Sequence, residues 1–259
     1  INILKKSQLK IGDEIISSSN SLNRVSASNI FNKVNNPAAD NAAFDGFAVN
    51  SSDTKGLNKK KVKLFKILGV VAAGDKPLSK RTKKFQTVEI MTGGIIPRGF
   101  DTIIPIEKII FYPNKKNPKS ILIDRKIKRF QHVRFKGSDY KKNDLLIKKG
   151  TILRSNHILA LKTLGVKNIK VKKIPNILFF STGNEITDQD KIPNWKVRNS
   201  NSHYIGSLKQ NFLFNIKYGG ILKDKDSILF KRKIIKMIRS KIDIIITSGA
   251  VSAGKFDYV

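Results

Sequence analysis

From Pro175 to the end of the chain, short apolar runs alternate with stretches of helical pattern. Residues 176–185, 215–222 and 242–249 have the composition of buried strands, and residues 199–214 and 226–241 that of helices. This order makes two crossover connections, which are right-handed in nearly all parallel sheets. We therefore expect a parallel-sheet, three-layer α/β domain over residues 175–259. Its ligands should bind beyond the carboxyl ends of the strands.

The preceding part of the chain has a different pattern. Between residues 35 and 139, short apolar runs are separated by clusters of Gly, Pro, Asn and Lys, which indicates a small β-barrel or sandwich. Residues 1–34 and 140–174 mix helical and irregular signals. The sequence thus predicts a multi-domain chain of class α/β plus β, in which a β-rich domain over 35–139 is inserted into an irregular linker domain over 1–34 and 140–174.

Composition excludes several kinds of site. The chain has no cysteine and only three scattered histidines, so disulfides, thiolate chemistry and histidine zinc sites have no basis. No apolar run approaches the roughly 18 residues needed to cross a bilayer. The first residues lack the pattern of a secretory signal. A cytoplasmic protein without membrane contact is the expectation.

The net charge of +32 allows two interpretations. Clustered basic residues bind nucleic acids and other polyanions. Here, however, the charge is spread along the whole chain, and only ten of the 51 basic residues are arginine, the residue favoured for phosphate and base contacts. A lysine-rich solvated surface is the favoured interpretation, with nucleic acid as the alternative.

Four acidic residues lie beside glycines in expected turns: Asp45, Asp139, Glu185 and Asp257. Glycine allows close approach of the backbone to a ligand, and a carboxylate can hold Mg²⁺ or accept protons. Each alone is explained by turn formation. Together with the SGAVSAG loop (248–254), whose N–H groups and hydroxyls can form an anion nest, they indicate an anion-binding α/β enzyme.

Six segments of the chain recur in one order in a known family. They are NPAADNAAFDGFAV, VEIMTGGIIPRGFDTIIPIE, HVRFKGSDYKKNDLLIKKGTIL, ILFFSTGNEI, VRNSNSHYIGSLKQNF and IIITSGAVSAGKFDYV. In this order, from about Ser21 to Val259, the chain resembles the molybdopterin molybdenumtransferase family (MoeA-type, which includes the gephyrin E domain). The resemblance implies a Mg²⁺-assisted insertion of molybdate into adenylylated molybdopterin, with release of AMP and the molybdenum cofactor.

The resemblance also implies roles for particular residues. The catalytic acids of the family fall on Asp45, Asp139, Glu185, Asp224 and Asp257, of which Asp45, Glu185 and Asp257 would bind the metal. The substrate-binding residues fall on Thr92, Gly93, Arg134, Lys136, Thr182, Gly183, Ser248, Gly249, Ser252 and Gly254. Asn184, Ala250 and the RFKG run (134–137) depart from the usual motifs of the family.

The resemblance further implies an elongated homodimer, with the linker domain in dimerisation and each active site combining the α/β domain of one subunit with the inserted domain of the other. Other proteins of molybdenum cofactor biosynthesis are candidate partners. The family continues beyond the last aspartate of this chain, so we expect a fragment that holds only the N-terminal half of the α/β domain. The alternatives are a basic anion- or nucleic-acid-binding protein, a molybdopterin-binding protein that inserts no metal, and a scaffold.

Overall fold

The computed structural model describes residues 10–78, 82–210, 212–223, 227–238 and 240–249, and it divides into two compact units. One unit comprises residues 30–146 with 163–165, and the other comprises the remaining described residues. No helix among the described residues is long and apolar enough to cross a membrane.

The first unit is built on a six-stranded sheet, in the order β7-β4-β6-β5-β9-β8. Only the β5–β6 pair is parallel, and the other neighbours are antiparallel. The expectation of a β-rich domain is confirmed. The bounds of the strands are β4 (Gly46–Val49), β5 (Lys63–Val71), β6 (Gln86–Ile90), β7 (Thr102–Pro105), β8 (Ile110–Tyr112) and β9 (Ser120–Ile123).

Strand β4 lies within the hydrophobic core, and all four of its residues are buried. Because successive side chains of a strand point to opposite faces, Phe47 and Val49 pack into one apolar cluster and Ala48 into another. Burial on both faces explains why this strand is a continuous apolar run. The shorter elements of the unit are β2 (Ile30–Phe31), β3 (Asn41–Ala42), β10 (Val133–Arg134), β11 (Leu145–Ile147) and the 3₁₀ helices η2 (Ser51–Thr54) and η3 (Ile106–Lys108).

In the second unit, an antiparallel pair joins β1 (Asp13–Ser17) to β12 (Asn168–Lys172), with Asp13 opposite Lys172. The carboxylate of Asp13 accepts a hydrogen bond from Lys172 Nζ at 2.7 Å and pairs with Lys170 Nζ at 3.2 Å. These contacts, that with Lys172 first, lower the pKa of Asp13. The 3₁₀ helix η1 (Ser18–Asn20) and helix α2 (Ser155–Thr163) complete this part of the chain.

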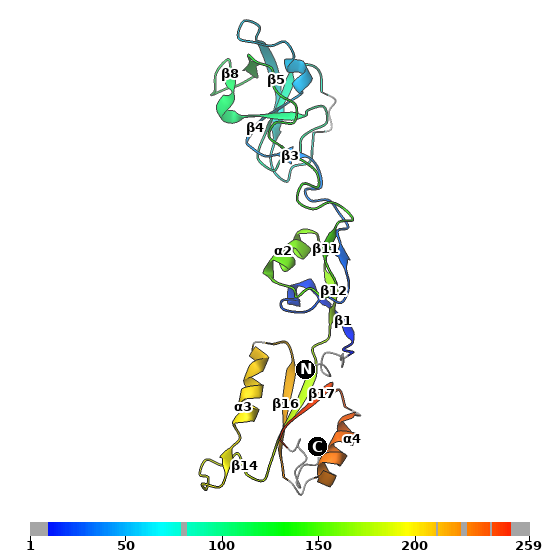
Figure 1. Ribbon diagram of the computed structural model, residues 1–259. Helices are drawn as coiled ribbons and strands as arrows, with labels where there is room; N and C mark the ends of the chain where they lie inside the picture. The colour runs from blue at the N-terminus through cyan, green and yellow to red at the C-terminus, as the bar shows by residue number, and fades with distance from the viewer. Residues whose placement is uncertain (1–9, 79–81, 211, 224–226, 239, 250–259) are drawn as a thin grey trace. The chain divides into compact units, whose positions relative to one another are not determined.

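The same unit contains the expected parallel sheet, in the order β16-β13-β17. Figure 1 shows α3 and α4 on opposite sides of this sheet, so the three-layer expectation is confirmed. Helix α3 is shorter than expected, because it gives way to the 3₁₀ turn η4 after Ser207. The elements are β13 (Asn176–Thr182), β14 (Ile186–Thr187), β15 (Val197–Arg198), α3 (Ser200–Ser207), η4 (Leu208–Gln210), β16 (Asn215–Leu222), α4 (Ser227–Ile238) and β17 (Ile244–Ser248).

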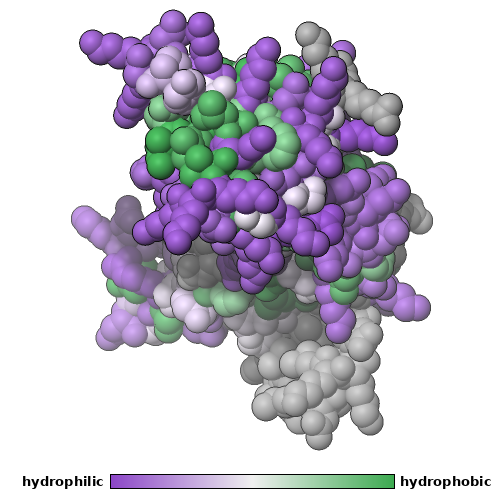
Figure 2. All heavy atoms as spheres, turned by 90° about the horizontal axis from the view of Figure 1, so that it is seen from above, coloured by the Kyte–Doolittle hydropathy of each residue, from purple (hydrophilic) through white to green (hydrophobic). Residues whose placement is uncertain are grey.

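The central strand β13 forms the core of this sheet. Leu178, Phe179 and Phe180 are at most 2% exposed. The ring of Phe180 lies close to the backbone of Gly219, where a Cβ would overlap it, and Lys233 Nζ lies 5.6 Å from the ring centroid. Elsewhere the surface is rich in charge: most of the face seen in Figure 2 is hydrophilic, with a patch of hydrophobic residues among the purple ones.

Candidate functional site

Asp45 and Thr92 form a direct contact in the first unit. Oδ1 of Asp45 accepts hydrogen bonds from the backbone N–H of Thr92 at 2.6 Å and from its hydroxyl at 2.7 Å. The backbone bond, followed by the hydroxyl bond, lowers the pKa of this exposed carboxyl below its usual range. Gly93 follows at φ +81°, a conformation that glycine adopts without strain. Asp45 is therefore ionised at neutral pH, and it orders the turn that begins at Thr92.

The short strand β3 brings three of the family motifs together. On one side, Ala42 exchanges backbone hydrogen bonds with Gly93 and Gly94, at 2.8 and 2.9 Å. On the other side, Ala42 pairs with Val133 of β10, and Arg134 follows in the same strand. Three segments that lie about 40 residues or more apart in the sequence are therefore neighbours at β3, a strand of only two residues.

The basic run that begins with Arg134, the last residue of β10, is held by carboxylates. Arg134 forms an ion pair with Asp139. The backbone N–H of Lys136 donates to Oδ1 of Asp40 at 2.7 Å, and Gly137 has φ +72°. Our reading of the sequence did not single out Asp40, although it lies in the same motif as Asp45. The expected substrate-binding residues Arg134 and Lys136 are thus each held by a carboxylate, Arg134 by the expected catalytic acid Asp139 and Lys136 by Asp40.

In the α/β sheet, the carboxyl ends of the three strands meet at Thr182 and Gly183. The hydroxyl of Thr182 donates to the carbonyl of Ser248 at the end of β17 at 2.6 Å. The N–H of Gly183 donates to the carbonyl of Leu222 at the end of β16 at 3.0 Å. Gly249 has φ +101°, and a Cβ there would lie 2.8 Å from Thr182 Oγ1. The expected residues Thr182, Gly183, Ser248 and Gly249 are thus neighbours.

Glu185 lies in the turn that follows β13. Gly183 has φ +136°, and a Cβ on it would lie only 2.5 and 2.6 Å from the two carboxylate oxygens of Glu185. The glutamate is exposed, and no hydrogen bond or ion pair reaches its carboxylate from the described residues. This carboxylate can accept a cation or a donor group of a ligand.

A polar network that the sequence did not reveal is centred on the buried side chains of Asn199 and Ser181. Asn199, 5% exposed, accepts from Ser181 Oγ at 2.5 Å and donates to Asp188 Oδ1 at 2.8 Å and Tyr218 Oη at 2.6 Å. Burial, more than the nearby charge of Asp188, raises the pKa of Tyr218. A pocket of about 670 Å³ lies beside the network, lined among others by Asp188, Tyr218 and His203.

The predicted residues fall into three sets. Asp45, Thr92, Gly93, Arg134, Lys136 and Asp139 belong to the first unit, and Thr182, Gly183, Glu185, Ser248 and Gly249 to the second. Asp224, Ser252, Gly254 and Asp257, together with the departure at Ala250, lie outside the described residues. Within the described ranges, no three His, Asp or Glu side chains lie together as a metal site would require, so the metal set stays a prediction.

Comparison with known proteins covers both units. Residues 2–165 match the family model described as "MoeA N-terminal region (domain I and II)", and residues 179–259 match the "Probable molybdopterin binding domain" model. Molybdopterin molybdenumtransferases of Staphylococcus aureus and Staphylococcus epidermidis are 32% and 28% identical over 92% and 100% of this chain. These alignments cover 55% and 60% of the two relatives.

The fold agrees with the sequence matches. The crystal structure of a molybdopterin biosynthesis MoeA protein from Pyrococcus horikosii superposes with a TM-score of 0.84 at 26% identity, over 96% of this chain and 62% of that one. The chain therefore spans somewhat more than half the length of the curated relatives it matches. Since the first family model covers well over half of the 259 residues and the second begins soon after it, this chain belongs to the MoeA family.

Proposed function

We propose that this chain serves the molybdopterin molybdenumtransferase reaction, in which molybdate is inserted into adenylylated molybdopterin and AMP and the molybdenum cofactor are released. The observation that supports this most is that nearly the whole chain matches two family models, one of the MoeA N-terminal region and one of a probable molybdopterin binding domain. The chain covers only 55–60% of the length of the relatives that bear this name. The activity of the complete enzyme is therefore proposed for it and not inferred from the relatives alone.

Two described carboxylates suit the magnesium ion that this reaction would use. Mg²⁺ prefers carboxylate oxygens and retains several waters, and when bound it neutralises charge on the leaving phosphate. The Glu185 carboxylate accepts no hydrogen bond and forms no ion pair within the described residues. The hydrogen bonds from Thr92 lower the pKa of Asp45 further below neutral and engage only its Oδ1. Asp257, the third proposed ligand, lies outside the described residues.

The remaining site residues would bind the anionic groups of the substrate. Lys136 and Arg134, the latter paired with Asp139, supply positive charge in one run of the chain. The end of β17 supplies the hydroxyl of Ser248, whose carbonyl accepts the hydroxyl proton of the neighbouring Thr182. A net charge of +32 favours such ligands at longer range. Ser252 and Gly254 are proposed for the same role, and Asp139, Asp224 and Asp257 complete the proposed catalytic acids.

The proposal extends to the setting of the protein. We place it in the cytoplasm as a homodimer that exchanges substrate and product with other proteins of molybdenum cofactor biosynthesis. Nucleic acid is not among the proposed ligands.

The test is release of AMP from adenylylated molybdopterin in the presence of molybdate and Mg²⁺. It should use this chain alone and this chain joined to the C-terminal part of a curated relative. Asp45→Asn and Glu185→Gln each remove one proposed metal ligand. Asp124→Asn is the matched control, because Asp124 lies in none of the six motif segments and its carboxylate pairs with the adjacent Arg125.

We expect AMP release by the extended protein, its loss in both site variants and its retention in the control. Binding without AMP release would favour a molybdopterin-binding protein that inserts no metal. If neither form bound the pterin and both bound polyanions with an affinity that falls steeply with salt, the proposed function would be wrong.

A further inference from the structure

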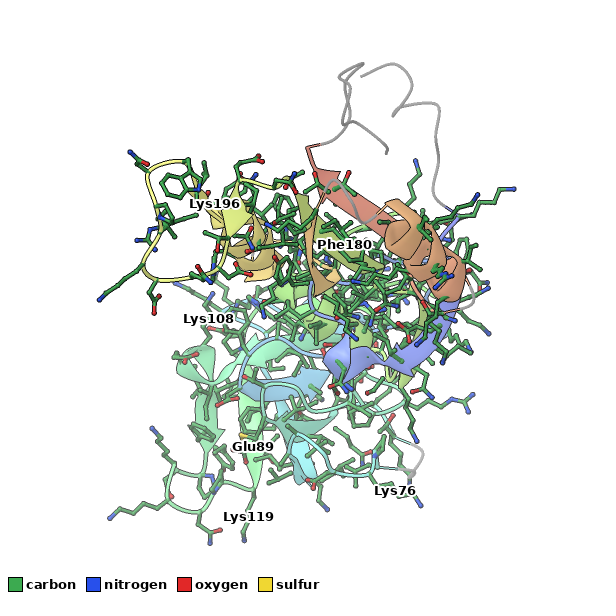
Figure 3. All side chains as sticks on the ribbon, turned by 90° about the horizontal axis from the view of Figure 1, so that it is seen from below. Lys76, Glu89, Lys108, Lys119, Phe180 and Lys196 are labelled. Carbon is green, nitrogen blue, oxygen red and sulfur yellow. The ribbon has the colours of Figure 1, made fainter. Side chains whose placement is uncertain are left out.

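Two lysine side chains donate to the backbone of the turn that carries Glu185. Lys223 Nζ lies 2.5 Å from the carbonyl oxygen of Ile186 and 3.3 Å from those of Gly183 and Asn184. Lys196 is labelled in Figure 3, and its Nζ lies 2.6 Å from the carbonyl oxygen of Asn184. An ammonium has three N–H donors and accepts no bond, so each lysine can hold several carbonyls of the turn.

With these contacts, every carbonyl of residues 183–186 accepts a hydrogen bond. The carbonyl of Glu185 itself accepts from the N–H of Val197 at 2.9 Å, and that of Gly183 also accepts from the N–H of Ile186 at 3.4 Å. Charge-assisted bonds are about twice as strong as neutral ones, so the lysines are the stronger restraints on the turn. The turn is therefore ordered from its backbone, without use of the glutamate side chain.

The lysines do not neutralise the glutamate. Both ammonium groups bond to backbone carbonyls of the turn, and among the described residues neither Lys196 nor Lys223 forms an ion pair with Glu185. The carboxylate lies against Gly183, where there is no Cβ to displace it. The result is an exposed, negatively charged group on a turn held by two cations.

We propose that Lys223, assisted by Lys196, is a positioning residue that holds the 183–186 turn so that the Glu185 carboxylate is presented to a divalent cation. Lys223 directly follows β16, whose last carbonyl already accepts from Gly183, so the lysine ties the end of one strand to the turn after its neighbour. This inference rests on the proposed metal-binding role of Glu185, but the role of Lys223 in ordering the turn can be tested separately.

The direction in which metal affinity changes when Lys223 is replaced distinguishes a positioning role from simple charge repulsion. Removal of a cation near a metal site should tighten metal binding if the cation acts only through Coulomb repulsion. If Lys223 positions Glu185, its removal should weaken binding, and loss of such a supporting partner typically costs about ten-fold or more in affinity. The probe is Mn²⁺ in place of Mg²⁺, titrated into the full chain and followed by electron paramagnetic resonance.

Three variants make the comparison. Lys223→Met keeps the aliphatic stem and removes the donors, and Lys223→Arg retains donors and charge. Lys217→Met removes the same charge from an exposed position of β16, the strand that Lys223 follows. We expect weaker Mn²⁺ binding by about ten-fold in Lys223→Met alone. In the same variant, the Ile186 and Val197 amides should exchange faster with deuterium, because their acceptors lie in the loosened turn.

The outcomes test the positioning role of Lys223 and the metal-binding role of Glu185 separately. Tighter Mn²⁺ binding by Lys223→Met, or unchanged exchange of the Ile186 and Val197 amides, would overturn the positioning role. Equal Mn²⁺ binding by the unmodified chain and Glu185→Gln would instead refute the proposed metal role of Glu185. The exchange measurement would then still decide whether Lys223 orders the turn.

Discussion

Replacement of Gly183 by alanine tests the geometry of the turn after β13. At φ +136°, an alanine carries backbone strain of about 1–3 kcal/mol. Its Cβ would also lie 2.5 Å from a carboxylate oxygen of Glu185, so that side chain must move away. This movement should cost little stability, because the Glu185 side chain is exposed. We therefore expect a loss of about 1–3 kcal/mol in the α/β sheet from strain alone, together with displacement of the glutamate.

The assay is urea-dependent hydrogen exchange of the β13 amides, which reads the α/β sheet without the other unit, combined with the carboxyl ¹³C resonance of Glu185. Gly220→Ala is the matched control: Gly220 also has positive φ, +98°, but a Cβ there has no neighbour within 4 Å. Both variants should lose stability, and only Gly183→Ala should shift the Glu185 resonance. Wild-type stability of Gly183→Ala, or equal resonance shifts in both variants, would refute the reasoning.

Three further substitutions have defined outcomes. Thr92→Val removes the hydroxyl bond to Asp45 but keeps the backbone bond, so the pKa of Asp45 should rise in an NMR titration yet stay below its ordinary value. Because the pKa of folded Asp45 is lowered, the stability gained from this contact is present at neutral pH and is lost as the pH falls through the lowered value. Phe180→Ala should destabilise the α/β sheet by about 3–5 kcal/mol in urea unfolding, since the ring is fully buried; a loss below 1 kcal/mol would contradict its place in the core. Asn199→Ala should cost about 1–3 kcal/mol by the same measurement, because the buried Ser181 hydroxyl loses its acceptor. Loss of a helix cap would not explain that result, as the Asn199 side chain makes no capping bond.

The elements of the α/β sheet were predictable because their signals are local. Within β13, the run from Ile177 to Phe180 is apolar on both faces, and the strand is bounded by Pro175 and Gly183, as expected of a buried parallel strand. Helix α3 was predicted too long. Its sequence, SNSHYIGS, contains few strong helix formers, and Ser207 Oγ bonds back to the Tyr204 carbonyl near its end.

The contacts within the candidate site were only partly predictable. Family motifs led to Asp45 and Thr92, and the structure joins them by two hydrogen bonds. By contrast, Asn199 and Lys223 reach partners 18 to 40 residues away because separate strands end at one edge of the sheet. Spacing along the chain carries no signal for such contacts. Glu185 was singled out because it is an acid close to a glycine in an expected turn, and neither Asn199 nor Lys223 has such a local pattern.

The pairing of β1 with β12 has a consequence for synthesis on the ribosome. Asp13 lies opposite Lys172, so β1 leaves the exit tunnel long before its partner exists. The entropy of closing a chain loop grows with the length of flexible chain between its ends. Folding of residues 30–146 in the meantime would replace that flexible chain by a compact body and bring the two strands within reach. We expect the β-rich unit to fold first during translation, and a variant that delays its folding to leave β1 exposed to aggregation or proteolysis.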